Sequence, residues 1–233
     1  IAALDRPLTI GLPSEYFSDN SNLSYIDIAK TELQRLGHKL VEVSLPHTQA
    51  AVPVYYVLAS AEASTNLSRY DGVRFGHRCN DPQSLQDLYE RSREEGFGEE
   101  VKRRILTGTY TLSVGYFDAY YLKAQKIRRL ISEDFQQAFT KVDVLLAPTS
   151  PTPAFKKNQL TDDHVAMYQQ DLFTVPTSLA GLPAMSLPCG FSNGLPMGMQ
   201  LIAPAFREDL LLELAAQYQR QTDWHLKRPE GAA

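Results

Sequence analysis

The sequence has little cysteine, no long hydrophobic run and no strong excess of charge of either sign. Its 233 residues contain two cysteines, Cys79 and Cys189, which lie far apart in the chain. They form no CxxC pair, and no histidine follows either one at the spacing of a zinc site. Two isolated thiols favour a reducing compartment, and we expect a cytoplasmic protein, although the sequence is also compatible with one long-range disulfide.

Further absences concern membranes and nucleic acids. No apolar stretch approaches the roughly 18 residues that a membrane-spanning helix needs. The first residues, IAALDRPLTIGLP, lack the charged and apolar regions of a signal peptide. The net charge of −4 disfavours a broad basic surface for nucleic acid. Because the chain does not begin with Met, we expect a processed chain or a part of a longer one.

The first 45 residues have the pattern of a strand, a helix and a second strand. Leu8–Leu12 is a short apolar run, and Lys39–Leu45 alternates between apolar and polar residues, as strands do. Ser24 is a candidate N-cap for the intervening helix, and Gly37 is placed to end it. The apolar residues of that helix recur at helical spacing: Ile26, Ala29, Leu33 and Leu36. A right-handed βαβ unit with parallel strands is therefore expected.

The middle of the sequence is helical, and strands return near its end. The helices are predicted over 51–70, 84–96, 99–113, 116–139, 163–179 (as far as Pro176) and 208–222. The strands are predicted over 142–147, 185–189 and 197–202, the last two joined by a Ser192-Asn193-Gly194 turn. This order predicts an α/β fold, with residues 1–233 forming one domain whose sheet uses distant segments.

Standard catalytic motifs are missing. The sequence contains no GxSxG elbow, no HExxH, no P-loop and no GxGxxG. Cys189 ends an apolar strand, which indicates a buried and inert thiol rather than a nucleophile. The histidines fall in predicted loops, turns or termini, where we expect surface side chains: His38, His47, His77, His164 and His225. The pattern alone therefore predicts no catalytic residue and no metal site.

Four basic residues of one predicted helix allow two interpretations. Lys123, Lys126, Arg128 and Arg129 follow the polar faces of one predicted helix, which indicates a solvated surface or, alternatively, an RNA-facing patch.

Arg104 and Asp171 each lie among apolar residues. Arg103 and Arg104 point about 100° apart on a helix, so one can face inward. Arg104 and Asp171 either make a structural ion pair or cap helices, or they bind the two ends of a zwitterionic ligand.

Five longer segments carry a resemblance that spans nearly the whole chain. They are YYVLASAEASTNLSRYDGVRFG (55–76), EGFGEEVKRRILTGTYTLSVGYFDAYYLKAQKIR (95–128), VDVLLAPTSPTPAF (142–155), MYQQDLFTVPTSLAGLPAMSLPCGF (167–191) and GLPMGMQLIAPAF (194–206). In order and spacing they resemble the amidase signature family, and the first two resemble its tRNA-dependent amidotransferase subunits. The resemblance implies the C-terminal part of an α/β/α sandwich with a mixed central sheet, which both halves of the family's chain build.

One part of the family pattern has no counterpart in this sequence. The family's catalytic triad is Ser–cis-Ser–Lys, and its glycine- and serine-rich signature (GGSSGGS-like) lies in the first half of the family's chain. Neither is matched here. We therefore expect this chain to correspond to the C-terminal half, without the catalytic half, and to be inactive alone.

The resemblance also implies site residues and partners. Arg104 matches an arginine that binds the α-carboxylate of glutamine, Asp171 an acid that binds its α-ammonium, and Tyr55 a tyrosine that lines the pocket. The family's serine hydrolyses glutamine and releases ammonia. A B subunit then uses ATP and Mg²⁺ to convert Glu-tRNA(Gln) to Gln-tRNA(Gln), and a small C subunit braces the complex. No cofactor is expected in this chain itself.

Two other functions stay open on the sequence. The chain could belong to another amidase signature hydrolase that acts on a small amide, or to a non-catalytic binding protein. An amide without amino-acid ends needs neither Arg104 nor Asp171, so these two residues discriminate between the hydrolases. Because the sheet would lack strands from the other half, we also expect the chain to self-associate as a symmetric dimer.

Overall fold

The structure is a computed structural model, and it describes residues 6–17, 23–157, 159 and 163–229. Its contacts divide the chain into two compact units. Residues 1–52 and 128–233 form the first, here called the sheet unit, and residues 53–127 form the second, the helical unit. The prediction of a single domain over residues 1–233 stays a prediction.

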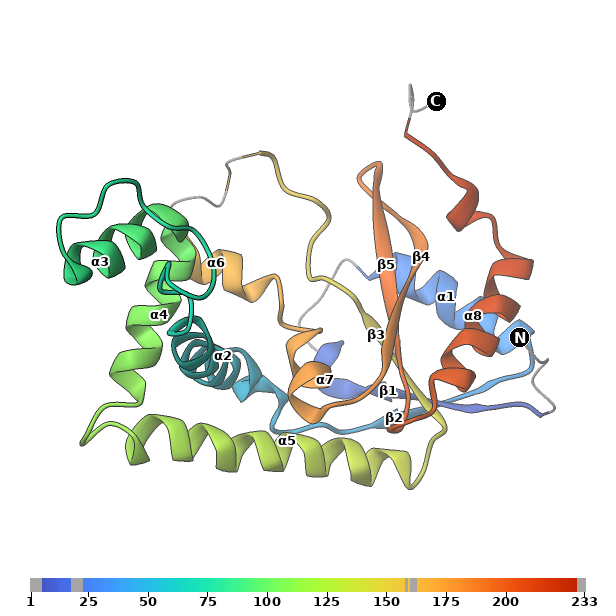
Figure 1. The fold of residues 1–233 in the computed structure, drawn as a ribbon. Helices are drawn as coiled ribbons and strands as arrows, with labels where there is room; N and C mark the ends of the chain where they lie inside the picture. The colour runs from blue at the N-terminus through green and yellow to red at the C-terminus, as the bar shows by residue number, and fades with distance from the viewer. Residues whose placement is uncertain (1–5, 18–22, 158, 160–162, 230–233) are drawn as a thin grey trace. The chain divides into compact units, whose positions relative to one another are not determined.

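The sheet unit is built on a five-stranded mixed sheet (Figure 1). Its strands are β1 (Thr9–Pro13), β2 (Lys39–Val43), β3 (Val144–Pro148), β4 (Ala184–Ser192) and β5 (Leu195–Ile202). They lie in the order β2-β1-β3-β5-β4. β1 is parallel to both β2 and β3, whereas β5 is antiparallel to β3 and β4. The predicted α/β class with a mixed sheet is confirmed.

The predicted strand–helix–strand unit is present at the start of the chain. α1 (Ser24–Arg35) joins the parallel strands β1 and β2. Gly37 has a φ of +90°, a conformation that favours glycine just after a helix. The prediction of Ser24 as the N-cap is wrong, because Ser24 is already helical and Leu23 takes the cap position without a side-chain bond.

One face of the sheet carries the main hydrophobic core. α1 and α8 (Glu208–Gln221) lie on this face (Figure 1). Side chains alternate between the two faces along a strand, so every second residue of β5 points into this core. The buried residues that β5 and α8 contribute are Met197, Met199, Leu201, Leu210, Leu211, Leu214, Ala215 and Tyr218. Residues about 60 positions earlier in β3, Val144 and Leu146, join the same cluster.

The segment before β4 contains two short helices where one longer helix was predicted. The structure has α6 (His164–Gln169), a turn, and α7 (Val175–Ala180). The single helix predicted over 163–179 is therefore wrong. Pro176 lies in the first turn of α7, where its missing N–H costs no hydrogen bond, rather than at a helix end.

The β4–β5 hairpin agrees with its sequence signal. Asn193 and Gly194 have φ values of +50° and +77°. Two consecutive residues in this left-handed region are typical of the tight turn that matches the twist of a hairpin. A register shift between Pro188 and Gly190 interrupts the ladder before the turn.

The helical unit follows the predicted helices closely. α2 (Ala51–Leu67) leads into it, and α3 (Leu85–Gly96) and α4 (Glu99–Thr111) lie within it. The Ser84 hydroxyl accepts a hydrogen bond from the Asp87 amide, which confirms the predicted start of α3. A π-helical turn (Asp118–Leu122) runs into α5 (Lys123–Phe139), which returns the chain to the sheet unit.

The remaining elements of the described residues are three 3-10 turns, at Ser14–Tyr16, Thr48–Ala50 and Trp224–Leu226. None of the helices in the described part of the chain combines the length and apolar character that a bilayer crossing requires.

Candidate functional site

α2 and α4 cross very closely in the helical unit, and a glycine makes that approach possible. A Cβ added at Gly108 of α4 would lie 1.9 Å from the carbonyl oxygen of Ser60 on α2. No real side chain fits at that distance. Ser60 is itself buried. The backbones of the two helices therefore meet at Gly108, and this contact fixes where the preceding turn of α4, which carries Arg104, stands against α2.

Arg104 has two neighbours that orient its guanidinium group. Its Nε donates to Oε1 of Glu100, one helical turn earlier, at 3.2 Å. The guanidinium carbon lies 5.8 Å from the centre of the Tyr56 ring, which allows a cation–π interaction. The side chain is 37% exposed, compared with 45% for Arg103. Arg104 is thus held between a carboxylate and an aromatic face while part of it stays accessible to a ligand.

The predicted pocket residue Tyr55 packs against Tyr56, the residue whose ring lies under Arg104. The rings of Tyr55 and Tyr56 meet edge to face, with their centres 5.0 Å apart. Of the two, Tyr56 is the one that faces Arg104. The role of Tyr55 in a substrate pocket stays a prediction, and Tyr56 is an addition that the structure makes to the site.

Asp171 belongs to the sheet unit and lies in the turn between α6 and α7. Its backbone carbonyl accepts hydrogen bonds from the amides of Thr174 and Val175 at 3.1 and 3.0 Å, which starts α7. The Asp171 side chain is half-buried. Because Arg104 and Asp171 belong to different units, their joint action on one ligand stays a prediction.

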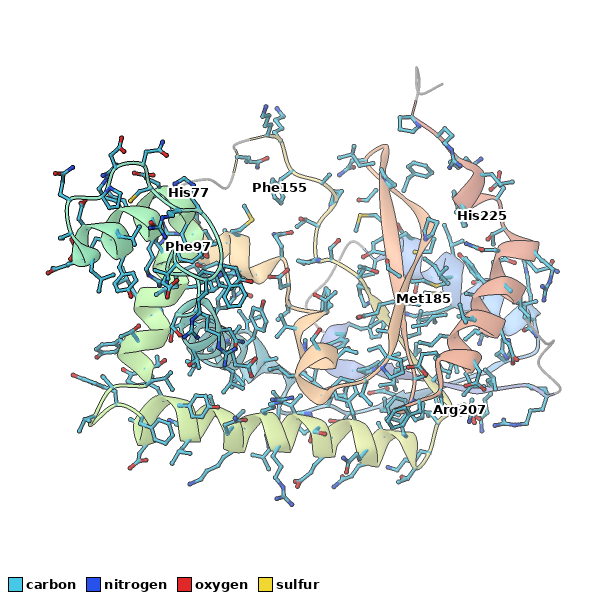
Figure 2. All side chains as sticks on the ribbon, viewed as in Figure 1. His77, Phe97, Phe155, Met185, Arg207 and His225 are labelled. Atoms are coloured by element: carbon cyan, nitrogen blue, oxygen red, sulfur yellow. The ribbon has the colours of Figure 1, made fainter. Side chains whose placement is uncertain are left out.

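Bonds from distant segments hold the turn that carries Asp171. The Gln200 amide of β5 donates to the carbonyl of Phe173 at 2.9 Å. The Thr152 hydroxyl donates to Oε1 of Gln170, also at 2.9 Å. Thr152 belongs to the loop after β3, on which Phe155 is labelled in Figure 2.

The histidines correct one prediction. His38 is buried, not exposed. Its Nδ1 accepts the amide of Leu8 at 3.0 Å, so the ring proton sits on Nε2, which faces Oε1 of Gln217 at 3.2 Å. Burial lowers the pKa of His38, because the charged imidazolium loses its solvation. His38 is therefore a neutral structural residue that joins Leu8, just before β1, to α8.

Two further histidines pair with carboxylates. Nδ1 of His47 lies 2.9 Å from Asp134 on α5, and Nε2 of His77 lies 2.7 Å from Glu95 on α3. His77 and Phe97 lie near each other in Figure 2 and line a small pocket of the helical unit. A carboxylate can orient an imidazole, but nucleophilic catalysis also needs a nucleophile within hydrogen-bond reach of that base. We interpret both pairs as structural.

The two thiols and the basic residues of α5 are the remaining candidates from the sequence. Cys79 and Cys189 are both buried and free, which confirms the predicted burial of Cys189, and burial raises the pKa of the Cys189 thiol to about 12. On α5, Arg128 donates to the Leu179 carbonyl at 2.8 Å, and Arg129 pairs with Glu133. Arg128 is thus tied to the fold, unlike the solvated residue that was predicted. Within the described ranges, no group of three metal-binding side chains is found.

Comparisons with known proteins decide the family. The sequence profile of a family described as "Amidase" matches residues 2–212. The chain belongs to the amidase family.

Within this family, the chain is similar to one kind of subunit. It is 60% identical over 229 residues to the A subunit of glutamyl-tRNA(Gln) amidotransferase from Nitrosococcus oceani, a match that covers 97% of this chain and 47% of that protein. The same subunit of Hahella chejuensis is 59% identical over 98% of this chain and 48% of its own length. The chain thus spans about half the length of the curated relatives it matches.

Solved structures agree with the fold. The crystal structure of the glutamyl-tRNA(Gln) amidotransferase A subunit from Thermotoga maritima matches with a TM-score of 0.68 and 36% identity, over 92% of this chain and 42% of that one. A bacterial aryl acylamidase of the amidase signature family matches with a TM-score of 0.69 over 95% of this chain and 45% of that one. At 19% identity this second match shows the fold alone. The predicted membership of the amidase signature fold is confirmed.

Sequence reasoning missed three residues around the site, namely Tyr56, Thr152 and Gln200. Of these, only Gln200 could have been noticed in the sequence, because it is a polar residue in the otherwise apolar run Met197–Ile202. A buried amide in such a strand needs a hydrogen-bond partner, and the sequence does not reveal which one.

Proposed function

We propose that this chain is the part of an amidotransferase A subunit that recognises the amino-acid end of glutamine. The complete subunit hydrolyses glutamine and supplies ammonia for the conversion of Glu-tRNA(Gln) to Gln-tRNA(Gln). The observation that carries this proposal is the 60% identity to the A subunit of a glutamyl-tRNA(Gln) amidotransferase over 97% of the chain.

The roles of the site residues follow the chemistry of each side chain. Arg104 binds the α-carboxylate, because a guanidinium fork matches a carboxylate with two parallel hydrogen bonds. Its half-exposed position beside the Tyr56 ring supports this role. Asp171 binds the α-ammonium group, and Tyr55 lines the pocket.

The chemical step is assigned to residues that this sequence does not contain. No glycine- and serine-rich signature occurs in the 233 residues. Acyl transfer from glutamine needs a nucleophile with an adjacent activating group. The chain alone is therefore inactive, and a Ser–cis-Ser–Lys triad elsewhere in the complete protein performs the hydrolysis.

The proposed partners are the other subunits of the amidotransferase. The B subunit uses ATP and Mg²⁺ to activate the mischarged tRNA, and the C subunit stabilises the complex. The relatives from Nitrosococcus oceani and Hahella chejuensis are each named as one subunit of an amidotransferase, which supports an assembly of this kind.

Ammonia release from glutamine tests the proposal. The purified 233-residue chain and the intact amidotransferase that contains it are assayed side by side with glutamine and with a small neutral amide. We expect release only from the intact enzyme, with glutamine as the preferred substrate. Release by the chain alone would overturn the assignment of the chemistry. A preference of the intact enzyme for the neutral amide would instead indicate another amidase signature hydrolase.

A further inference from the structure

Gln200 occupies an unusual position for an amide side chain. It lies in β5, directly opposite Ala147 of β3 and Ser186 of β4, so strands flank it on both sides. It is only 4% exposed. Burying an amide group costs free energy unless the group is hydrogen-bonded. Here the amide donates to the Phe173 carbonyl at 2.9 Å, so an interior strand of the sheet holds a backbone atom of the turn that carries Asp171.

The side chain of Phe173 also holds this turn in place. This ring is 1% exposed, and its centre lies 5.3 Å from the centre of the Tyr16 ring. Phe173 is thus held through its carbonyl by Gln200 and through its ring by the segment that follows β1. Phe173 is the second residue after Asp171, and the Asp171 carbonyl is itself bonded to the start of α7.

A second anchor acts on the residue before Asp171. The Thr152 hydroxyl donates to Gln170 at 2.9 Å. The loop that carries Thr152 is tied to the sheet, because the Thr149 amide donates to the Gly198 carbonyl at 3.0 Å. The hydroxyl groups of Thr149 and Ser186 also lie 2.9 Å apart. Both hydrogen bonds therefore connect the turn to the β4–β5 pair, one directly through Gln200 and the other through the loop after β3.

We propose that Gln200 and Thr152 are positioning residues that hold Asp171 where it receives the ammonium group of the substrate. This inference rests on the proposed function of Asp171. A carboxylate at the end of a short side chain can bind a charged group at a fixed place only if its backbone does not move. Gln200 fixes the backbone after Asp171, and Thr152 fixes the side chain before it. Neither residue touches the substrate.

The test compares glutamine with glutaramate, which has the same amide and carboxylate but no ammonium group. The intact amidotransferase is prepared with Gln200→Met, which keeps the length of the side chain and removes the donor, and with Thr152→Val, which removes the hydroxyl. Glutaramate is measured as a substrate or, where turnover is too slow, as a competitive inhibitor. We expect kcat/KM for glutamine to fall about 10-fold, mainly through a higher KM. The kcat/KM for glutaramate, or its inhibition constant where it is an inhibitor, should change less than about 2-fold.

Controls separate positioning from folding. Thr152→Ser retains the hydroxyl and should restore use of glutamine. Thr31→Val removes an exposed hydroxyl that bonds to its own helix, and it should leave both substrates unchanged. Because Thr152 is exposed, its substitution keeps the test valid even if Gln200→Met fails to fold.

The outcomes distinguish this inference from the proposed function. Asp171→Asn is measured with the same two compounds. If Asp171→Asn impairs glutamine selectively and Thr152→Val impairs both compounds equally or neither, the positioning role is overturned and the role of Asp171 stands. If Asp171→Asn also impairs both equally, the ammonium-binding role itself fails, and the positioning role fails with it.

Discussion

Arg104 and Asp171 are held in different ways, although each is proposed to bind one end of the same amino acid. Arg104 depends on neighbours in its own helical unit: Glu100 one turn away and Tyr56 on the adjacent helix. Asp171 lies in a turn without regular structure, and side chains from a central strand and a distant loop hold that turn. Local bonds can thus place a long side chain, whereas a short side chain requires that the backbone itself be fixed.

This comparison predicts the largest effect at Arg104. In the intact amidotransferase, Arg104→Ala should lower transition-state stabilisation for glutamine by about 2–5 kcal/mol, the usual cost of removing one partner of a buried charge pair. That corresponds to a loss of roughly 30-fold or more in kcat/KM. Steady-state ammonia release measures it.

Arg103→Ala is the matched control for this prediction. Arg103 is the adjacent residue and also pairs with Glu100, whereas Arg104 is the arginine that lies over the Tyr56 ring. Its removal should leave kcat/KM within about 2-fold, because a surface ion pair contributes little. Equal losses in the two variants would refute a specific role for Arg104.

The next effect concerns the contact that places Arg104. Gly108→Ala should destabilise the helical unit by about 1–3 kcal/mol, because the added methyl group meets the rigid Ser60 carbonyl. Gly98→Ala, which meets no atom within 4 Å, is the control. Thermal unfolding compares the two. If Gly108→Ala were as stable as Gly98→Ala, the close crossing of α2 and α4 would be incorrect.

A smaller effect should appear in the sheet unit as a pH dependence. Burial lowers the folded-state pKa of His38, so the folded chain binds fewer protons there than the unfolded chain. The stabilisation is present above the unfolded pKa of about 6.5 and is lost as the pH falls below it. His38→Asn keeps an acceptor for the Leu8 amide and removes the titration. The fall in melting temperature from about pH 7.5 to about pH 5.5 should be smaller in the variant than in the parent chain.

The smallest predicted effect is self-association of the 233-residue chain. β3 is central and fully buried, whereas β2 and β4 are the edges of the described sheet. The β4 edge is the more apolar of the two, and we expect a weak dimer through it at micromolar concentration. Ala184→Lys, at an exposed position of β4, should reduce dimerisation in sedimentation experiments. A parent chain that stays a monomer would contradict the prediction.

The sequence predicted those features that depend on neighbouring residues. The Asn193-Gly194 turn, the helix that starts at Ser84 and the helix end at Gly37 follow from local backbone preferences, and all three are present. The helix over 163–179 was wrong because bonds from Gln200 and Thr152, which are distant in sequence, hold the intervening turn. His38 was misplaced for the same reason, since Leu8 and Gln217 bury it. Arg104 and Asp171 were singled out by their apolar surroundings, but the choice of ligand binding over a structural ion pair came from the resemblance, because no local pattern distinguishes a ligand-binding ion from a structural one.

The most direct test of the proposed recognition measures which end of glutamine each residue binds. Intact enzyme with Arg104→Ala or Asp171→Asn is compared on glutamine, on glutaramate and on 4-aminobutanamide, which lacks the carboxylate. Arg104→Ala should abolish the preference for glutamine over 4-aminobutanamide and retain the preference over glutaramate. Asp171→Asn should abolish the preference for glutamine over glutaramate and retain the preference over 4-aminobutanamide. If both variants lost the two preferences to the same extent, or kept both, this chain would not supply the recognition of the amino-acid end.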